Sequence, residues 1–153
     1  MHILPRFCFI LALLAATFLS TTAWAADGLI VKASPYAPKE TLDRLEKVLK
    51  SKGITVFARI DHAAGAGKVG QSMDATEILI FGNPKIGTPL MQDTRSIGID
   101  LPLKALAWQD DKGSWIAYND PKWLAKRHGN KTDLIITKMT GILDKLTDAA
   151  TAK

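Results

Sequence analysis

The sequence predicts an α+β fold, a single compact domain with a mainly antiparallel sheet of about five strands and helices packed on one face. Short apolar segments of strand length are joined by turns, which favours hairpins. Two long segments carry apolar residues at helical spacing, and one face of the sheet supplies the surface that their apolar stripes need. The expected order is β-α-β-β-(short α)-β-β-(short α)-α.

The first half of the domain supplies a strand, a long helix and a second strand. Residues 28–33 (GLIVKA) are short and β-prone. Pro38 suits the first position of a helix, apolar residues then recur at helical spacing, and Gly53 suits the position after its end. Residues 54–60 alternate in a way typical of a half-buried strand. The alternating apolar side chains are Ile54, Val56, Ala58 and Ile60.

A glycine-rich loop, a compact strand and a short helix are expected next. Residues 61–75 (DHAAGAGKVGQSMDA) predict the loop, and residues 76–81 (TEILIF) predict the strand. Asn83 and Thr88 are each a capping residue followed by proline, so a short helix is expected within residues 84–94.

The last part supplies a hairpin and two helices. Residues 103–109 and 114–118 are strand-like, and the turn at residues 110–113 (DDKG) joins them. Residues 120–129 predict a short helix with an aspartate cap and a terminal glycine. A long helix with an apolar stripe is expected from about residue 132 to residue 149.

The N-terminal 25 residues have the order of a secretory signal peptide. Arg6 is basic, residues 7–19 (FCFILALLAATFL) are uncharged and apolar, and Ala23-Trp24-Ala25 follows a small-x-small pattern. The apolar run of thirteen residues is too short to span a bilayer at about 1.5 Å per residue. We expect cleavage after Ala25 and an exported, periplasmic or secreted domain over residues 26–153; an uncleaved anchor or a buried core helix is the alternative.

Composition limits the classes of partner and chemistry. The single cysteine, Cys8, leaves with the signal peptide, so the mature domain has no thiol nucleophile. The chain carries 20 basic and 15 acidic side chains, interspersed and without a basic stripe, so no nucleic-acid partner is expected. No segment after the signal peptide is apolar enough to predict a stable membrane span.

Residues 65–70 (GAGKVG) fit the G-x-G-x-x-G pattern of dinucleotide-binding loops. That chemistry requires a helix that starts inside the motif and directs its N-terminus at the pyrophosphate. Only five residues separate Gly70 from the next strand, so no helix is expected there and the motif is interpreted as a loop.

Two histidines remain for site chemistry. His62 follows Asp61 where a strand ends, so it is a candidate general base or metal ligand; a turn-capping role is the alternative. His128 lies in the last turn of a predicted helix, where a cation meets the helix dipole. With Met91, the two histidines suggest a soft metal or haem site, and the cofactor stays open.

Aromatic and hydroxyl side chains give weaker signals. Trp108 and Trp115 are expected as cross-strand neighbours in the hairpin, and a stacking wall for a planar ligand is the alternative. Ser72, Ser96 and Ser114 lack the G-x-S-x-G elbow, so no nucleophilic serine is predicted.

Four segments together resemble the Domain of Unknown Function 302 family. They are residues 60–66 (IDHAAGA), 81–91 (FGNPKIGTPLM), 99–106 (IDLPLKAL) and 118–121 (YNDP). The resemblance covers roughly residues 28–145 and implies an α+β domain of β-α-β(4)-α order from a bacterial or archaeal source. It implies no established reaction. Many members carry a cysteine after Leu-Pro, where this chain has Leu103.

The function expected from these observations is a non-catalytic ligand-binding or stress-related periplasmic module. The candidate ligand-binding residues are Asp61, His62, Asn83, Thr88, Tyr118, Arg127 and His128. The alternatives are a metal- or haem-binding protein that uses His62, His128 and Met91, and a small hydrolase or isomerase with His62 as base. The ligand is unknown, and an exposed strand edge leaves a homodimer open.

Overall fold

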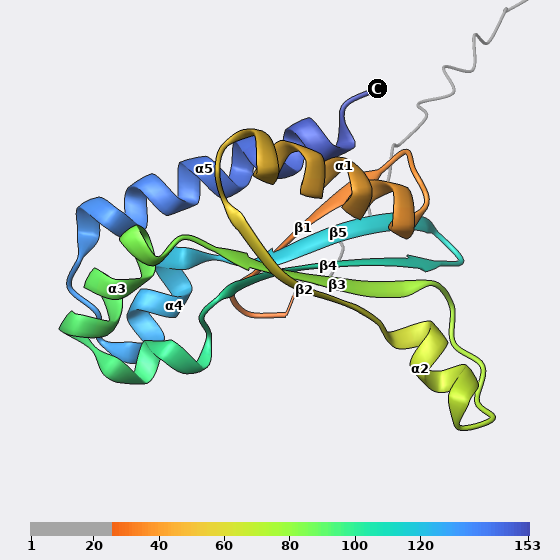
Figure 1. Cartoon of the computed structure of the whole chain (residues 1–153), viewed down its shortest axis with the longest axis horizontal. Helices are drawn as coiled ribbons and strands as arrows, with labels where there is room; N and C mark the ends of the chain where they lie inside the picture. Colours follow the sequence, from red (N-terminus) through yellow and green to blue (C-terminus); the bar gives the residue numbers. More distant parts are fainter. Residues whose placement is uncertain (1–25) are drawn as a thin grey trace, which may run out of the picture.

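The computed structural model describes residues 26–153, so the expected signal peptide and Cys8 lie outside the described residues. These residues form five strands, five α-helices and one 3₁₀ helix, η1, and Figure 1 shows their arrangement. In chain order the elements are β1 (Leu29–Ser34), α1 (Pro38–Ser51), β2 (Thr55–Asp61), α2 (His62–Lys68), β3 (Thr76–Gly82), α3 (Pro84–Asp93), η1 (Arg95–Ile99), β4 (Leu103–Asp110), β5 (Gly113–Asn119), α4 (Pro121–His128) and α5 (Asp133–Thr151).

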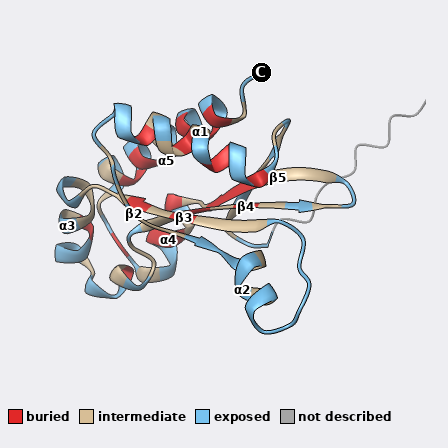
Figure 2. Ribbon diagram, turned by 45° about the vertical axis from the view of Figure 1, so that its right-hand side comes forward, coloured by how far each residue is buried: buried red, intermediate tan, exposed pale blue. Residues whose placement is uncertain are grey.

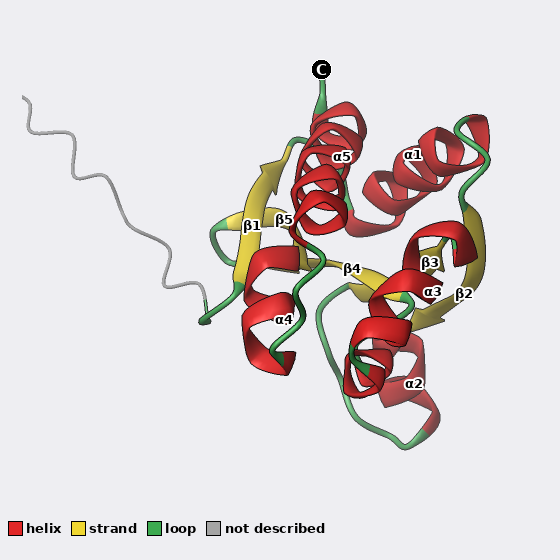
Figure 3. Ribbon diagram, turned by 90° about the vertical axis from the view of Figure 1, so that its left-hand side faces the viewer, coloured by secondary structure: helices red, strands yellow, loops and turns green. Residues whose placement is uncertain are grey.

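The five strands form one antiparallel sheet in the order β1-β5-β4-β3-β2. Helices α1 and α5 lie side by side over one face, α3 and α4 lie at one end of the sheet, and α2 lies at the other end (Figures 1 and 3). This arrangement confirms the predicted α+β class and the antiparallel sheet. None of the helices within residues 26–153 has both the length and the apolar character needed to cross a bilayer.

The main core lies between this sheet face and the two long helices (Figure 2). Because strand side chains alternate between faces, Leu79 and Phe81 point into it while Ile78 and Ile80 face away and stay partly exposed. Leu42, Leu45 and Leu49 of α1 recur at helical spacing and are fully buried. The predicted pairing of Trp108 with Trp115 is confirmed by the β4–β5 register.

A β-bulge in β2 changes the predicted alternation of residues 54–60. The register with β3 shifts between Val56 and Ala58, so one extra residue, Phe57, is accommodated. Val56 packs against the main core, whereas Ile60 is 44% exposed and Phe57 is 53% exposed. The prediction that the four alternating residues share one buried face was therefore wrong, because a bulge reverses the facing of the residues that follow it.

The prediction of a loop over residues 61–75 was also wrong in part, because residues 62–68 form α2. The Asp61 carboxylate accepts a hydrogen bond from the Ala64 N–H at 2.8 Å, which caps the helix. The helix starts before Gly65 and ends near Gly70, which has φ +74°. Its N-terminus is therefore outside the glycine motif, where a dinucleotide loop would require it.

Candidate functional site

Two adjoining cavities lie where β2 begins, β3 ends and helices α3 and α5 approach the sheet. Their volumes are about 250 Å³ and about 340 Å³. The residues common to both are Gly82, Asn83, Ile86, Leu103 and Met139. The two spaces therefore adjoin and are considered together as the candidate site.

The first cavity is lined almost entirely by apolar groups from α3, from β2 and from the segment before β4. The bulge in β2 brings Phe57 to its wall, and Leu101 and Pro102 form another side. A Cβ at Gly82 would lie 3.5 Å from Pro102 and 3.6 Å from Phe57, so a larger side chain there would compete for this space. The local sequence therefore combines a bulge, a glycine and a proline to leave an apolar space open.

The second cavity differs from the first in charge. Its wall carries the apolar stripe of α5, including Ile142, together with three lysines. The lysines are Lys52, Lys138 and Lys145. No carboxylate lines it, and within residues 26–153 none of the three lysine amines takes part in an ion pair or a side-chain hydrogen bond. An uncompensated positive charge therefore borders an apolar wall.

The predicted site residues Asn83, Thr88 and Met91 all lie at the first cavity. Asn83 caps α3 through a hydrogen bond from the Lys85 N–H to its side-chain oxygen at 2.9 Å, as its sequence position predicted. Thr88 lies inside α3, so the prediction that it caps a helix before Pro89 was wrong. The helix continues through that proline.

A separate cluster joins η1 to the end of α4. His128 Nε2 lies 2.6 Å from Asp100 Oδ2, and His128 Nδ1 lies 3.0 Å from Ser96 Oγ. The His128 side chain is 8% exposed and that of Asp100 is 12% exposed, whereas Ser96 is exposed. Arg127 Nη1 also lies 3.3 Å from the Asp100 carboxylate.

The hydrogen-bonding capacities of the three side chains give one arrangement of protons for a neutral His128 beside an ionised Asp100. An ionised carboxylate only accepts, so Nε2 of a neutral His128 carries the ring proton and donates it to Asp100. The Nδ1 lone pair then accepts the hydroxyl proton of Ser96. A serine, a base and an orienting carboxylate thus lie in the order that nucleophile activation requires.

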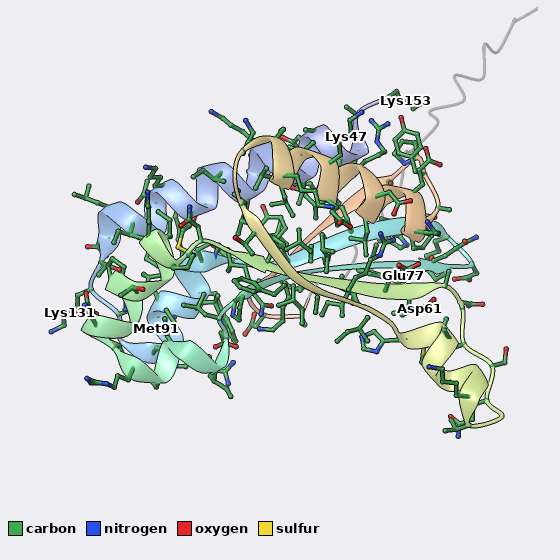
Figure 4. All side chains as sticks on the ribbon, in the orientation of Figure 1. Lys47, Asp61, Glu77, Met91, Lys131 and Lys153 are labelled. Atoms are coloured by element: carbon green, nitrogen blue, oxygen red, sulfur yellow. The ribbon has the colours of Figure 1, made fainter. Side chains whose placement is uncertain are left out.

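The remaining predicted residues lie elsewhere. Asp61 and His62 are exposed at the α2 end of the sheet, and Figure 4 shows Asp61 and Met91 at opposite ends of the molecule. The structure therefore does not bring His62 together with Met91. Within residues 26–153 no three His, Cys, Asp or Glu side chains form a group suited to a metal ion. Tyr118 is 5% exposed in the main core, where burial raises its pKa.

Sequence reasoning missed Asp100 and Ser96, which are 28 and 32 positions from His128 and meet it only through the fold. It also missed the three lysines. Lys138 and Lys145 carried a usable signal, because a spacing of seven residues places both on one side of a helix.

Curated proteins from Brucella are similar to this chain in sequence. The chain is 48% identical over 125 residues to "Fluoride-specific ion channel FluC 1" of Brucella suis biovar 1, a match that covers 78% of this chain and 49% of that protein. "Fluoride-specific ion channel FluC 2" of Brucella melitensis biotype 1 matches at 48% identity, with 46% of its length covered. The chain thus spans about half the length of these curated relatives.

A crystal structure of an uncharacterized conserved DUF302 protein from Bacillus stearothermophilus has the same fold. The TM-score is 0.73 at 20% sequence identity, over 82% of this chain and 99% of the other. The family model described as "Domain of unknown function DUF302" matches residues 30–147. The chain therefore belongs to the DUF302 family, as its four sequence segments suggested.

Proposed function

We propose that this chain is an exported domain that binds an apolar ligand in the two adjoining cavities. The observation that carries the proposal is their size and lining: about 250 Å³ and about 340 Å³, with a common wall that contains Ile86, Leu103 and Met139. Apolar spaces of this size with few polar groups are typical of small-molecule sites.

A plug in the first cavity tests the proposal. A Cβ at Gly87 of α3 would have Leu101 and Met91 as its nearest neighbours at 3.9 Å, so a phenylalanine there extends into the cavity wall. We expect Gly87→Phe to weaken binding of a neutral apolar probe, N-phenylnaphthylamine, by about tenfold or more, since the added ring takes the space of the probe. The measurement is a fluorescence titration.

The matched control is Gly141→Phe. Gly141 also lies in a helix, but it is exposed, and a Cβ there would have no neighbour within 4 Å. Circular dichroism and thermal melting establish that both variants are folded. Probe binding by folded Gly87→Phe at wild-type affinity would contradict the proposal, and so would equal loss of binding in the two variants.

The exported location rests on residues 1–25. Expression of the full chain in a Gram-negative host should give a periplasmic protein whose first residue is Ala26. Ala23→Asp combined with Ala25→Asp, which removes the small residues before the expected cleavage point, should leave the precursor uncut. An uncut wild-type chain in the cytoplasm would contradict export without affecting the cavity proposal.

The cluster at η1 favours a second candidate function, acyl transfer at Ser96 with His128 as base. In this reaction Ser96 Oγ bonds to an acyl carbonyl carbon while its proton passes to Nδ1 of His128. The imidazolium, held by Asp100, then donates that proton to the departing alcohol. Attack by water, deprotonated by the same nitrogen, releases the acid and restores the serine.

A fluorophosphonate reagent tests this candidate, because a nucleophilic serine displaces fluoride and stays phosphonylated. We expect labelling of Ser96, its loss in Ser96→Ala, and a decrease of about tenfold or more in rate in His128→Asn. Ser72→Ala is the control and should label like the wild type. Failure of the folded wild type to label would show that the cluster is only a structural link between η1 and α4.

A further inference from the structure

We infer that the ligand of the two cavities is an amphiphilic anion, whose apolar tail fills them and whose carboxylate or phosphate head lies among Lys52, Lys138 and Lys145. The inference rests on the proposed function, since it assigns a chemical class to the ligand of the same site. Its basis is the combination of an apolar wall with three cations that have no carboxylate partner among the described residues.

The three lysines border one space from two helices. Lys138 and Lys145 are seven residues apart on α5, about two turns, and therefore extend from the same side of that helix. Lys52 comes from the end of α1. Between the two α5 lysines, Ile142 and Leu143 form part of the apolar wall. The cations and the wall thus belong to one surface.

Several other cations of the domain are paired with carboxylates, whereas the three cavity lysines are not. Lys32 contacts both Asp144 and Asp148 of α5 at 2.6 Å, on the side of that helix toward β1. Arg59 holds Glu77 at 2.7 Å and also contacts Asp43. Asp144 and Asp148 of α5 are therefore paired with Lys32, and neither of them lines the second cavity.

The chemistry of lysine suits an anionic head at the mouth of an apolar site. The four-carbon stems extend the apolar surface while the ammonium groups stay in water. The three cations that border one space each attract an anionic head. They would repel a cationic head, and a neutral head would gain nothing from the charges, so the arrangement discriminates by charge.

The shape of the site suits a long tail. Ile86 of α3 and Met139 of α5 line both cavities, so a long tail that starts in the lysine-bordered space would follow these residues to the first cavity. Met139 and Met91 have flexible side chains that adapt to apolar surfaces of different shape. The first cavity has no lysine in its lining and therefore receives the end of the tail.

Calorimetric titration of the mature domain with four single-tailed compounds tests the inference. The compounds are dodecanoate, dodecyl phosphate, dodecanol and dodecyltrimethylammonium, each below its micelle concentration. We expect at least one anion to bind about tenfold or more tightly than dodecanol, the cation to bind most weakly, and the preference for the anion to fall as salt rises. A preference between the two anions identifies the head as carboxylate or phosphate.

The triple variant Lys52→Gln/Lys138→Gln/Lys145→Gln should lose about tenfold in affinity for the preferred anion and keep its affinity for dodecanol. The control, Lys47→Gln/Lys112→Gln/Lys122→Gln, removes the same charge from residues outside the cavity lining. It should retain the preference for the anion, since the head then lies among unchanged lysines.

The two proposals fail in different ways. Equal affinity for dodecanol and both anions, or an unchanged anion affinity in the folded triple variant, would overturn the anionic head and leave the apolar site standing. An equal loss of anion affinity in both triple variants would show a general effect of net charge, and it would also overturn the proposal of an anionic head. No binding of any of the four compounds or of N-phenylnaphthylamine would overturn the proposed function itself.

Discussion

The two ends of the sheet differ in how they are built, although both are made from short helices. At one end, α2 follows β2 directly and contains no buried residue. At the other end, α3, η1 and α4 surround a second apolar cluster that includes Leu90, Ile97 and Met139. The cavities, the three lysines and the Ser96 cluster all belong to this second end or adjoin it. A binding site needs side chains packed around it. The end with α3, η1 and α4 has such a packed cluster, whereas α2 contains no buried residue.

The two histidines show the same difference. His62 is adjacent to Asp61 in the chain, but the Asp61 carboxylate accepts a backbone N–H of α2 and His62 remains exposed. His128 is far from Asp100 in sequence and lies 2.6 Å from its carboxylate in the fold. Packing between two elements therefore brings a carboxylate to His128, whereas the carboxylate next to His62 in the chain caps α2 instead.

Removal of a core side chain from the second end should have the largest effect on stability. Leu90 is fully buried there, so Leu90→Ala should lower the free energy of unfolding by about 2–5 kcal/mol, since it leaves a larger cavity. Urea denaturation followed by circular dichroism measures the change. Val69→Ala, at a residue 71% exposed just after α2, is the control and should change stability by less than about 0.5 kcal/mol. Similar losses in the two variants would contradict the difference between the ends.

We expect the polar contacts of the Asp100 carboxylate with His128 and Arg127 to stabilise the second end of the sheet. Asp100→Ala should cost about 1–3 kcal/mol, because the nearly buried ring of His128 loses the acceptor for its Nε2 proton. A double-mutant cycle with His128→Asn, measured by urea denaturation, isolates the pair. A coupling energy near zero would show that the 2.6 Å contact contributes nothing to stability.

Short sequence patterns predicted most of the fold because the elements they predict depend on interactions within a few residues. The leucine spacing after Pro38, the aspartate cap at residue 120 and the turn before Gly113 each act over a few residues. The bulge at Phe57 escaped detection, since an inserted residue leaves the apolar content of a strand unchanged and alters only its facing. Helix α2 escaped because two glycines in seven residues suggest a loop, and its cap outweighed them.

The candidate site was predicted only where it coincides with local structure. Asn83 was singled out as a helix cap, and the cap of α3 also lies at the cavity wall. Of the Ser96 cluster only His128 was predicted as a site residue, because no sequence pattern links Asp100 and Ser96 to it. The lysine group required knowledge that α1 ends beside α5, which is a property of the packing of the two helices.

Removal of a helix cap should have a smaller effect on stability, and that effect should differ between the two ends of the sheet. Asp61→Ala and Asn83→Ala each remove the oxygen that accepts a first-turn backbone N–H, a change that costs about 0.5–2 kcal/mol of helix stability. In α2 we expect faster hydrogen exchange confined to that helix, with global stability unchanged, since α2 buries nothing. In α3 the loss should appear in global unfolding, because Leu90 ties that helix to the core. Global destabilisation by Asp61→Ala would contradict this separation.

The smallest effect concerns acid stability at the α2 end, where the β4–β5 turn also lies. A hydrogen bond from the Trp115 indole N–H, joined by the backbone N–H of Lys112, holds the pKa of Asp110 below its ordinary value of 3.8. A depressed carboxyl pKa stabilises the folded state above the unfolded pKa, and this contribution is lost as the pH falls through the folded pKa. Wild type should therefore be more stable than Asp110→Asn at neutral pH, and the difference should shrink as the pH falls below about 4. Urea denaturation across that range measures it, and Trp115→Phe, which lacks the indole donor, should weaken the pH dependence. A difference that stays constant with pH would mean that the indole hydrogen bond does not depend on the charge of the carboxylate.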